Sequence, residues 1–225
     1  MVNQTKYRST TVGRKSLAKE RREQIIRALN RCIAKYGLQN TSIKKIAQEA
    51  GVQPGILHHY FKDRDEIIEE LVNKIVDELT AEYLAEIGNH VDPETRFAKA
   101  VEFMFGPQMI NTEYAGFFYD CWAEAKRNER IRDSFRMLYS RFRKAIVDLL
   151  LESGKSAGLS RAEIEELATM VIAIQDGVSL QWEMAPRQVP LPQMTRLTKR
   201  LIELYVEDKT RKRSKNPARR KARRA

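Results

Sequence analysis

The chain has 225 residues, 42% of them hydrophobic, and a formal net charge of +11, so it can bury one large core or two small ones. Two cysteines exclude a disulfide framework, and no apolar run approaches the ~20 residues that span a bilayer. The opening residues are polar and basic rather than a signal peptide, so we expect a cytoplasmic protein with no membrane partner.

The first helix is preceded by a basic segment. Residues 1–16 are polar, basic and without periodicity, which predicts a flexible arm. Residues 17–36 carry one apolar stripe that ends at Gly37, which predicts a helix. Cys32 lies on that stripe and Cys121 lies among aromatic residues, so both are expected to be buried free thiols.

Residues 42–61, SIKKIAQEAGVQPGILHHYF, predict two short helices joined by a tight turn. The apolar residues of the first helix have the i, i+3, i+4, i+7 spacing of one buried face: Ile43, Ile46, Ala47 and Ala50. Gly51 ends that helix, because this position commonly needs a positive φ, and Pro54 suits the first turn of the next helix. Leu57 and Phe61 give the second helix its apolar side. This layout is that of a helix-turn-helix, whose second helix enters the major groove of DNA.

The rest of the chain is also predicted to be helical. A helix over residues 63–87 has an apolar stripe and a length of about 36 Å, enough to link two domains. Five more helices are predicted over residues 93–105, 113–127, 129–153, 161–184 and 193–208. No segment alternates with period two. We therefore expect an all-α protein of about nine helices, with a three-helix head (17–62), a linking helix and helical bundle (63–208), and a disordered basic tail (209–225).

The positive charge is concentrated at the two ends of the chain. Residues 1–62 hold 13 Lys and Arg against 3 Asp and Glu, and residues 209–225 hold 10 against none. Residues 63–208 hold 18 against 27. A basic end on an acidic body is typical of a nucleic-acid-binding protein with a separate second domain. The alternative that the C-terminal run only keeps the protein soluble stays open.

The order of residue types in the head resembles the N-terminal domain of TetR-family transcriptional repressors. The likeness rests on Gly37, Thr41-Ser42, Ile46-Ala47, Ala50-Gly51-Val52, Gly55-Ile56-Leu57, Tyr60-Phe61 and Asp65. Residues 117–130 and 173–182 more loosely resemble the ligand-binding half of the BetI-like branch of the family. One position departs from the pattern, since His58 stands where the family often has a phosphate-contacting Tyr.

The resemblance implies how such a protein works. It implies a homodimer whose two heads lie in successive major grooves of a palindromic operator. It also implies that an unknown small-molecule effector, bound in the C-terminal bundle, moves the linking helix and lowers the affinity for DNA.

The exposed side of the second short helix supplies the candidate DNA contacts. Gln53, His58 and His59 are predicted to face base edges or nearby phosphates, since Gln can pair with adenine through two hydrogen bonds. Pro54 and Gly55 leave room for a close approach of the backbone. Phosphate contacts, which set the register on DNA, are predicted for Thr41, Ser42, Lys44, Tyr60 and Lys62.

Some alternatives remain for these residues. Tyr60 could equally pack in the core of the head. A phosphate at Lys62 would also meet the positive end of the linking-helix dipole. His58 and His59 point about 100° apart on a helix, and no cluster of Cys or acidic residues completes a metal site, so we expect no metal.

The second domain combines large apolar side chains with a few polar groups, which is typical of a ligand pocket. The candidate effector residues are Phe105, Met109, Phe118, Trp122, Gln175, Asp176 and Trp182. An acidic group among aromatic rings would suit a cationic or amine-bearing effector, whereas the alternative is that these residues are simply core. The last two helices have wider apolar stripes than one inner face needs. They predict a four-helix dimer interface, with packing inside one subunit as the alternative.

Motifs for catalysis are missing from the sequence. There is no complete nucleophile elbow, phosphate loop, dinucleotide fingerprint or HExxH zinc motif, so we expect no enzyme and no cofactor. The predicted function is that of a sequence-specific DNA-binding regulator, a repressor released from its operator by a small molecule. The alternative is an architectural or nucleoid-type DNA-binding protein without a ligand.

Overall fold

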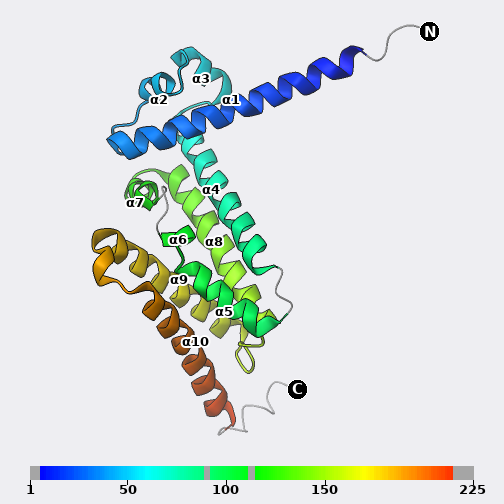
Figure 1. Ribbon diagram of the computed structural model, residues 1–225, viewed down its shortest axis with the longest axis vertical. Helices are drawn as coiled ribbons and strands as arrows, with labels where there is room; N and C mark the ends of the chain where they lie inside the picture. The colour runs from blue at the N-terminus through cyan, green and yellow to red at the C-terminus, as the bar shows by residue number, and fades with distance from the viewer. Residues whose placement is uncertain (1–5, 89–91, 111–114, 215–225) are drawn as a thin grey trace, which may run out of the picture. The chain divides into compact units, whose positions relative to one another are not determined.

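The computed structural model describes residues 6–88, 92–110 and 115–214 (Figure 1). Every regular element in these ranges is helical, with ten α-helices and one short 3-10 helix, so the all-α prediction is confirmed. The chain forms two compact units. The first contains residues 1–76 and 116–136, and the second contains residues 77–115 and 137–225. The predicted boundary at residues 62 and 63 therefore differs from the structural division, because part of the later chain packs with the head.

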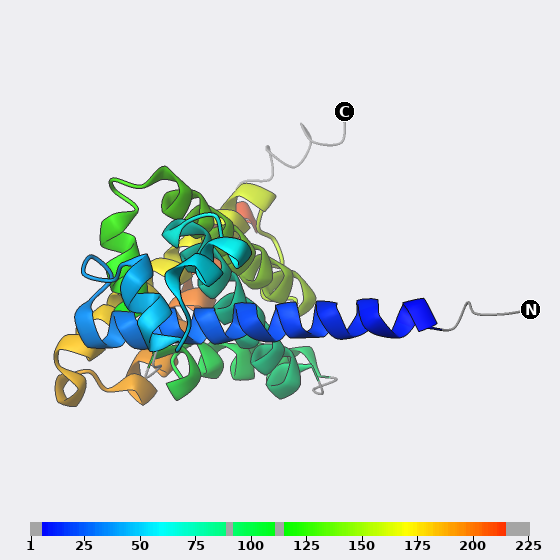
Figure 2. The same cartoon turned by 90° about the horizontal axis from the view of Figure 1, so that it is seen from above.

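The first unit is built around α1. Its helices are α1 (Lys6–Tyr36), α2 (Ile43–Glu49), α3 (Pro54–Tyr60), the first part of α4 (Arg64–Ile87), α7 (Ala115–Glu124) and the start of α8 (Glu129–Glu152). Helix α1 contacts both α2 and α3, and Figure 2 shows it as one long helix whose N-terminal half extends past them.

The prediction of a flexible arm over residues 1–16 is wrong from Lys6 onward, where α1 begins. The physical reason is that extending an existing helix costs far less than starting one, and this segment has no proline to stop it. Residues 1–5 lie outside the described part of the chain.

The predicted helix ends of the head are confirmed, and Ile46, Ala47 and Ala50 are buried as predicted, whereas Ile43 is only partly buried. Gly37 and Gly51 have φ angles of +75° and +66°, the left-handed conformation expected after a helix. The buried side chains come from the three helices of the head and from the first part of α4: Ile25, Ile26, Leu29, Cys32, Ile46, Ala47, Leu57, Phe61, Ile67, Ile68 and Leu71. Both cysteines are buried free thiols.

The second unit contains the remaining helices. They are the end of α4, α5 (Pro93–Met104), α6 (Pro107–Ile110), most of α8, α9 (Arg161–Met184), the 3-10 helix η1 (Pro186–Gln188) and α10 (Leu191–Ser214). Two of these elements, α6 and η1, lie between the predicted helices. Each begins with a proline, Pro107 or Pro186, at the position where its missing N–H costs nothing.

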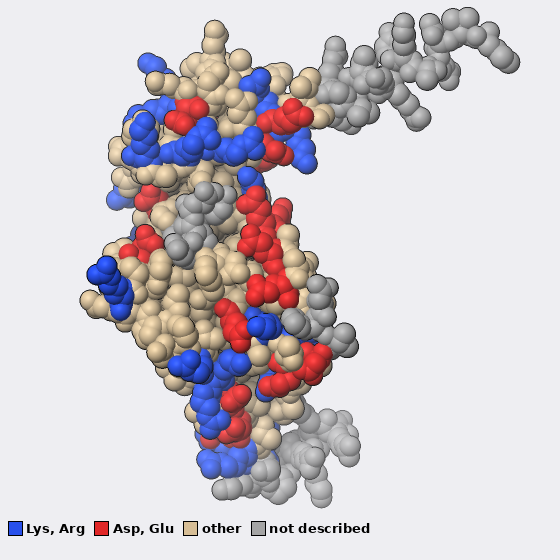
Figure 3. Space-filling view, in the orientation of Figure 1, with Lys and Arg blue, Asp and Glu red and all other residues tan. Residues whose placement is uncertain are grey.

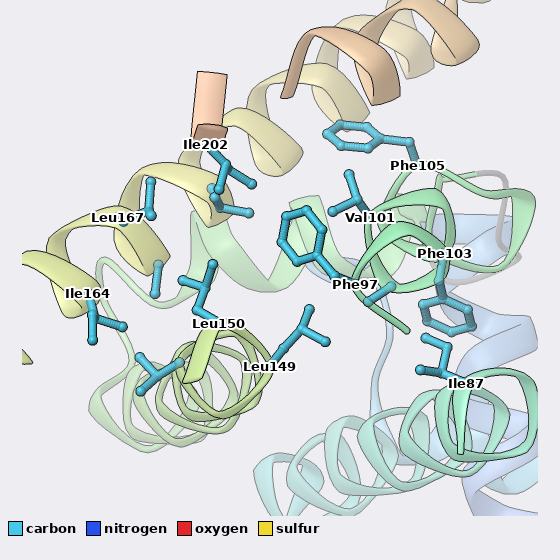
Figure 4. Close-up of a cluster of buried hydrophobic side chains, with 14 of the residues drawn as sticks. Ile87, Phe97, Val101, Phe103, Phe105, Leu149, Leu150, Ile164, Leu167 and Ile202 are labelled. Carbon is cyan, nitrogen blue, oxygen red and sulfur yellow. The ribbon is translucent and has the colours of Figure 1, made fainter. Parts of the chain in front are cut away.

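The apolar core of the second unit collects side chains from α5, α8, α9 and α10. Figure 4 shows Phe97 of α5 among Val101, Leu150 of α8 and Ile202 of α10. Phe103 and Phe105 belong to the same buried cluster. This packing joins helices that are far apart in the sequence.

The C-terminal tail was predicted to be disordered from residue 209, but α10 continues to Ser214. The prediction is wrong for residues 209–214 because Lys209 and Arg213 form ion pairs with Glu163 of α9. Residues 215–225 lie outside the described part of the chain.

Glu163 also completes the N-terminus of α9. The Ser160 hydroxyl accepts a hydrogen bond from the Glu163 amide at 3.3 Å, and the Ser160 amide donates to Glu163 Oε2 at 2.7 Å. This reciprocal pair is a capping box. The Ser160 amide is the main cause that lowers the pKa of Glu163 from 4.5 to about 2, with help from Lys209 and Arg213, although partial burial opposes it.

We predict that Glu163 makes the protein less stable in acid. Because its folded pKa lies below its unfolded value, its stabilising effect is complete above pH 4.5 and is lost as the pH falls toward about 2. The effect amounts to at most about 3 kcal/mol of unfolding free energy. Urea unfolding of Glu163→Gln should show a weaker loss of stability between pH 5 and pH 3 than the wild type. The control is Glu165→Gln, which removes the same charge from an exposed pair with Arg161. An unchanged pH profile in Glu163→Gln would contradict the prediction.

Candidate nucleic-acid interface and effector region

The turn between α2 and α3 is fixed by local hydrogen bonds. Ser42 caps α2, because its hydroxyl accepts a hydrogen bond from the backbone amide of Lys45. The Val52 amide returns to the carbonyl of Ala47 at 2.9 Å and closes the turn after α2. The side chain of Gln24, on α1, donates to the carbonyl of Ala50 at 2.6 Å. The helix-turn-helix is therefore attached to α1 at its bend.

Helix α3 presents its polar side to the outside. Gln53, His58 and His59 are exposed, whereas Leu57 is completely buried and Phe61 is 2% exposed. Gln53 occupies the N-cap position, but its side chain makes no capping hydrogen bond. The side-chain amide of Gln53 therefore has no partner among the described residues. The burial of Leu57 and Phe61 confirms the predicted orientation of α3, but Ile56, expected beside them, is 40% exposed.

Gly55 is not required by the fold of the protein. Its φ is not in the left-handed region, and a Cβ added there would meet no atom within 4 Å. Within a helix, glycine is less stable than alanine by about 1 kcal/mol. The fold alone would therefore favour alanine at this exposed position, next to Pro54. Because glycine has no side chain, the backbone of α3 is uncovered there.

The predicted phosphate contacts divide into two groups. Ser42, Lys44 and Lys62 are exposed and can reach a phosphate. Thr41 cannot, because its side chain is completely buried and its hydroxyl donates to the carbonyl of Gly37 at 2.9 Å. The prediction for Thr41 is therefore wrong, since its hydroxyl stabilises the loop between α1 and α2.

Tyr60 has a mixed environment. It is partly buried, and its ring packs edge-on against the ring of His59 with centroids 5.0 Å apart. Its partial burial agrees in part with a role in the core, and the contact with DNA stays a prediction.

The start of α4 does not offer an anion site beside Lys62. The Asp63 carboxylate accepts from the Glu66 amide at 2.9 Å, and the Glu66 carboxylate accepts from the Lys62 amide at 2.6 Å. Partial burial would raise the pKa of Asp63, but the Glu66 amide and the Arg130 guanidinium outweigh it and hold the pKa below its usual value. Carboxylates of the chain therefore already occupy the positive end of the helix dipole. Only the Lys62 side chain remains for a phosphate.

Arg22 is important for the head and was not predicted. Its guanidinium lies 4.1 Å from the centroid of the Phe61 ring and donates to the carbonyl of Tyr60. It also pairs with Glu66 and Glu70 on α4. Arg22 thus connects α1, the end of α3 and α4. Glu66 and Glu70 are four residues apart on one helix face, a signal that could have indicated a basic partner but not which one.

The seven candidate effector residues belong to different compact units. Phe118 and Trp122 lie in the first unit, where Phe118 contacts Phe135 with ring centroids 6.1 Å apart and Trp122 is 59% exposed. In the second unit, Phe105 is buried in the apolar core, and Met109 and Trp182 pack against that core. The position of Phe105 therefore agrees with the alternative that it is a core residue rather than part of a pocket.

The polar candidates lie together on α9. Gln175 is buried and donates to the Ser179 hydroxyl at 2.9 Å. Asp176 accepts a hydrogen bond from the Tyr139 hydroxyl of α8 at 3.0 Å. The Asp176 residue is exposed as a whole, yet packing around its carboxylate raises its pKa, which the Tyr139 hydrogen bond opposes.

Two other site classes find no support in the described ranges. No group of three or more His, Cys, Asp and Glu side chains there could hold a metal ion. Among the same residues, no helix is long and apolar enough to cross a membrane.

Comparison with known proteins identifies the family. Residues 25–71 match the bacterial regulatory proteins of the tetR family, and residues 93–207 match the C-terminal domain of BetI-type transcriptional repressors. The chain belongs to the TetR family. Its members are DNA-binding transcriptional regulators and not enzymes, so the predicted function class is confirmed. Regulators of the TetR family bind DNA operators, typically as dimers and with small-molecule effectors.

Two curated relatives cover most of the chain. The nicotine-responsive transcriptional repressor of Paenarthrobacter nicotinovorans is 29% identical over 191 residues, which cover 84% of this chain and 95% of that protein. The transcriptional regulator BetI of Burkholderia cenocepacia is 25% identical over 188 residues, which cover 83% and 92%.

Two solved structures have the same fold. A transcriptional regulator of Pseudomonas aeruginosa PAO1 matches with a TM-score of 0.77 and 19% identity, covering 86% of this chain and 94% of that one. One from Saccharomonospora viridis, crystallised in complex with choline, matches with a TM-score of 0.68 and 25% identity, covering 82% and 96%.

We predict opposite effects of Gly55→Ala on folding and on DNA binding. The methyl group meets no protein atom, so the variant should gain up to about 1 kcal/mol of stability from helix propensity. The same methyl group should weaken binding to the operator, because it stands where DNA would approach α3. Thermal unfolding and fluorescence anisotropy with operator DNA measure the two effects. Equal or tighter DNA binding by the variant would show that Gly55 does not face DNA.

Proposed function

We propose that this protein is a repressor that binds a palindromic operator as a homodimer and leaves it when a small cationic amine binds the C-terminal domain. The observation that carries the proposal is α3, a helix anchored by Leu57 and Phe61 whose other side exposes Gln53, His58 and His59, with no partner for the Gln53 side chain among the described residues. We further expect the protein to act in the cytoplasm, where operator DNA is found.

The charge of the head supports DNA as the partner. Lys and Arg outnumber Asp and Glu over the part of the first unit that holds α1 to α3 (Figure 3). Such charge gives affinity for phosphates without sequence information. In the proposal, Gln53 and the two histidines of α3 contact base edges or nearby phosphates, while Ser42, Lys44 and Lys62 contact phosphates.

The two ends of the chain add to this affinity in the proposal. They lie outside both family matches and hold more basic than acidic residues, with 7 basic and 2 acidic residues in 1–24 and 10 against 1 in 208–225. Residues 25–207 hold 24 basic and 27 acidic residues. We infer that the ends bind phosphates beyond the specific contacts of α3.

Exposed apolar side chains on α9 and α10 support the homodimer. A single subunit leaves several large side chains of these two helices open to water: Met170, Leu180, Met184, Leu197, Leu201 and Leu204. Exposed apolar surface of this extent marks an interaction site. Two such helices from each of two subunits would form the four-helix interface that the sequence predicts.

The class of effector is suggested by relatives and by one acidic group. The relatives include a nicotine-responsive repressor and a regulator crystallised with choline. In this chain, the pKa of Asp176 is raised by the packing around its carboxylate. A bound cation would relieve that unfavourable desolvation, so Asp176 and Tyr139 are the proposed polar part of an amine site.

We predict that Gln53→Ala and Lys62→Ala separate sequence reading from phosphate binding. Gln53→Ala should relax the preference for one base pair by about 1–3 kcal/mol. Lys62→Ala should weaken cognate and scrambled DNA alike and lower the slope of log affinity against log salt by about 1. Binding titrations at several salt concentrations measure both effects.

The wild-type footprint provides the control for this comparison. Protection of two symmetric half-sites is the pattern that a dimer of heads produces, whereas general coating of DNA would favour the architectural alternative. Equal losses on cognate and scrambled DNA for Gln53→Ala would refute its role in reading bases.

We predict that choline or nicotine stabilises the protein, and that Asp176→Asn weakens this effect. A ligand at 100 times its Kd adds about 2.7 kcal/mol to the stability of the state that it binds. A thermal-shift panel of quaternary amines, tertiary amines, fatty acids and uncharged aromatics tests the class. Glu183→Gln, an exposed acid on the same helix, is the control. Stabilisation by fatty acids alone would overturn the amine proposal.

A further inference from the structure

A residue far from the head in sequence is attached directly to it. The carboxylate of Asp120, on α7, accepts a hydrogen bond from the backbone amide of Leu38 at 2.8 Å. Leu38 follows the end of α1, and its side chain is 1% exposed. The two residues are 82 positions apart along the chain, and both belong to the first compact unit.

The Leu38 amide needs this acceptor because of how α1 ends. Gly37 takes a left-handed conformation and returns its amide to the Ile33 carbonyl at 2.8 Å. This type of ending makes a single hydrogen bond back to the helix and leaves the next amide without a helical acceptor. A buried amide without an acceptor is unfavourable. Asp120 therefore completes the C-terminus of α1 from another helix.

Hydrogen bonds link the loop that Asp120 contacts to the start of α2. The Thr41 amide donates to the Leu38 carbonyl at 3.1 Å, and the Thr41 hydroxyl donates to Gly37. Ser42, the next residue, caps α2. Leu38 is thus connected through a hydrogen-bonded loop to the first helix of the helix-turn-helix.

The same segment also holds the other end of the head. Arg130, in the first turn of α8, pairs with Asp63 at 2.8 Å and with Glu69 at 3.0 Å. The side-chain amide of Asn128 donates to the Asp65 carboxylate at 2.7 Å. These contacts fix the start of α4, directly after α3. Residues 116–136 therefore contact the chain both before α2, at Leu38, and after α3, at the start of α4.

We propose that residues 116–136 set the position of the DNA-reading helices, and that Asp120 is the positioning residue that does so through Leu38. The proposal rests on the DNA-binding function and adds a connection to the head that is separate from α4. Helix α8 is continuous from Glu129 to Glu152, so its first turns belong to the first unit and the rest belongs to the second. The segment is thereby joined to the effector-binding half by the chain itself.

The test compares three variants that change the same kind of charge. Asp120→Ala removes the acceptor, whereas Asp120→Asn keeps an acceptor oxygen and removes the charge. Asp133→Ala is the control, because Asp133 is exposed on α8 and pairs only with the nearby Arg136 among the contacts seen in the described residues. Circular dichroism first shows that each variant is folded.

The first measurement needs no DNA. Hydrogen exchange of the Leu38 amide should be about tenfold faster in Asp120→Ala than in the wild type, because its hydrogen bond is lost. Asp120→Asn and Asp133→Ala should exchange like the wild type. Unchanged protection of Leu38 in Asp120→Ala would overturn the contact itself, whether or not the protein binds an operator.

The second measurement reads the position of the heads. The two half-sites of the footprinted operator are moved apart or together by one base pair, and affinity is compared with the natural spacing. The wild type, Asp120→Asn and Asp133→Ala should prefer the natural spacing, whereas Asp120→Ala should lose most of that preference. A merely destabilised protein would instead bind all three spacings more weakly by the same factor, and this result would overturn the proposal.

A further variant, Arg130→Gln, keeps the proposal testable if Asp120→Ala does not fold. It removes the ion pairs with Asp63 and Glu69 at the start of α4. It should also reduce the preference for natural spacing, and an unchanged preference would contradict the role of the segment. If the wild type protects no operator, the DNA-binding function fails, while hydrogen exchange at Leu38 still decides the contact.

Discussion

The DNA-reading helix depends on packing that it cannot supply itself. Helix α3 has seven residues, and isolated helices shorter than about 12–15 residues are marginal in water. Leu57 and Phe61 anchor it in the core of the head, and Arg22 stacks on Phe61 while binding the Tyr60 carbonyl. Removing a buried leucine of this kind costs about 2–5 kcal/mol. The exposed residues of α3 can therefore be chosen for DNA only because its other face is held firmly.

Electrostatics in the first unit have two separate roles. The acidic residues at the start of α4 neutralise Arg22 and Arg130 and satisfy the helix N-terminus. Those two arginines are therefore structural and are not part of the surface offered to DNA. The charges left for phosphates are exposed ones such as Lys44 and Lys62. This division explains why a basic head also carries a cluster of carboxylates.

Local patterns in the sequence were enough to predict most of the fold. The spacing of apolar residues located the long helices, and Gly51 and Pro54 located the turn before α3. The same patterns located Gln53 and the exposed histidines on the polar face. The two short helices that begin at Pro107 and Pro186 were not predicted, because each has too few residues to show an apolar stripe.

The errors in the candidate site have a common physical cause. Thr41 is a residue type that often contacts phosphates, but here it is buried and its hydroxyl donates a hydrogen bond to the Gly37 carbonyl. Arg22 and Asp120 act on partners 38 to 82 positions away, and no local spacing reveals such partners. Which charged side chains are free for a ligand is thus decided by tertiary contacts.

The two cysteines have a practical consequence for studying this protein. Cys32 and Cys121 are both fully buried, and both lie in the first unit, one on α1 and the other beside Asp120 on α7. Burial raises the pKa of the Cys121 thiol and, to a lesser degree, that of Cys32, so neither forms the reactive thiolate readily while the unit is closed. The rate of alkylation by a thiol reagent therefore records how often this half of the molecule opens, without any added label.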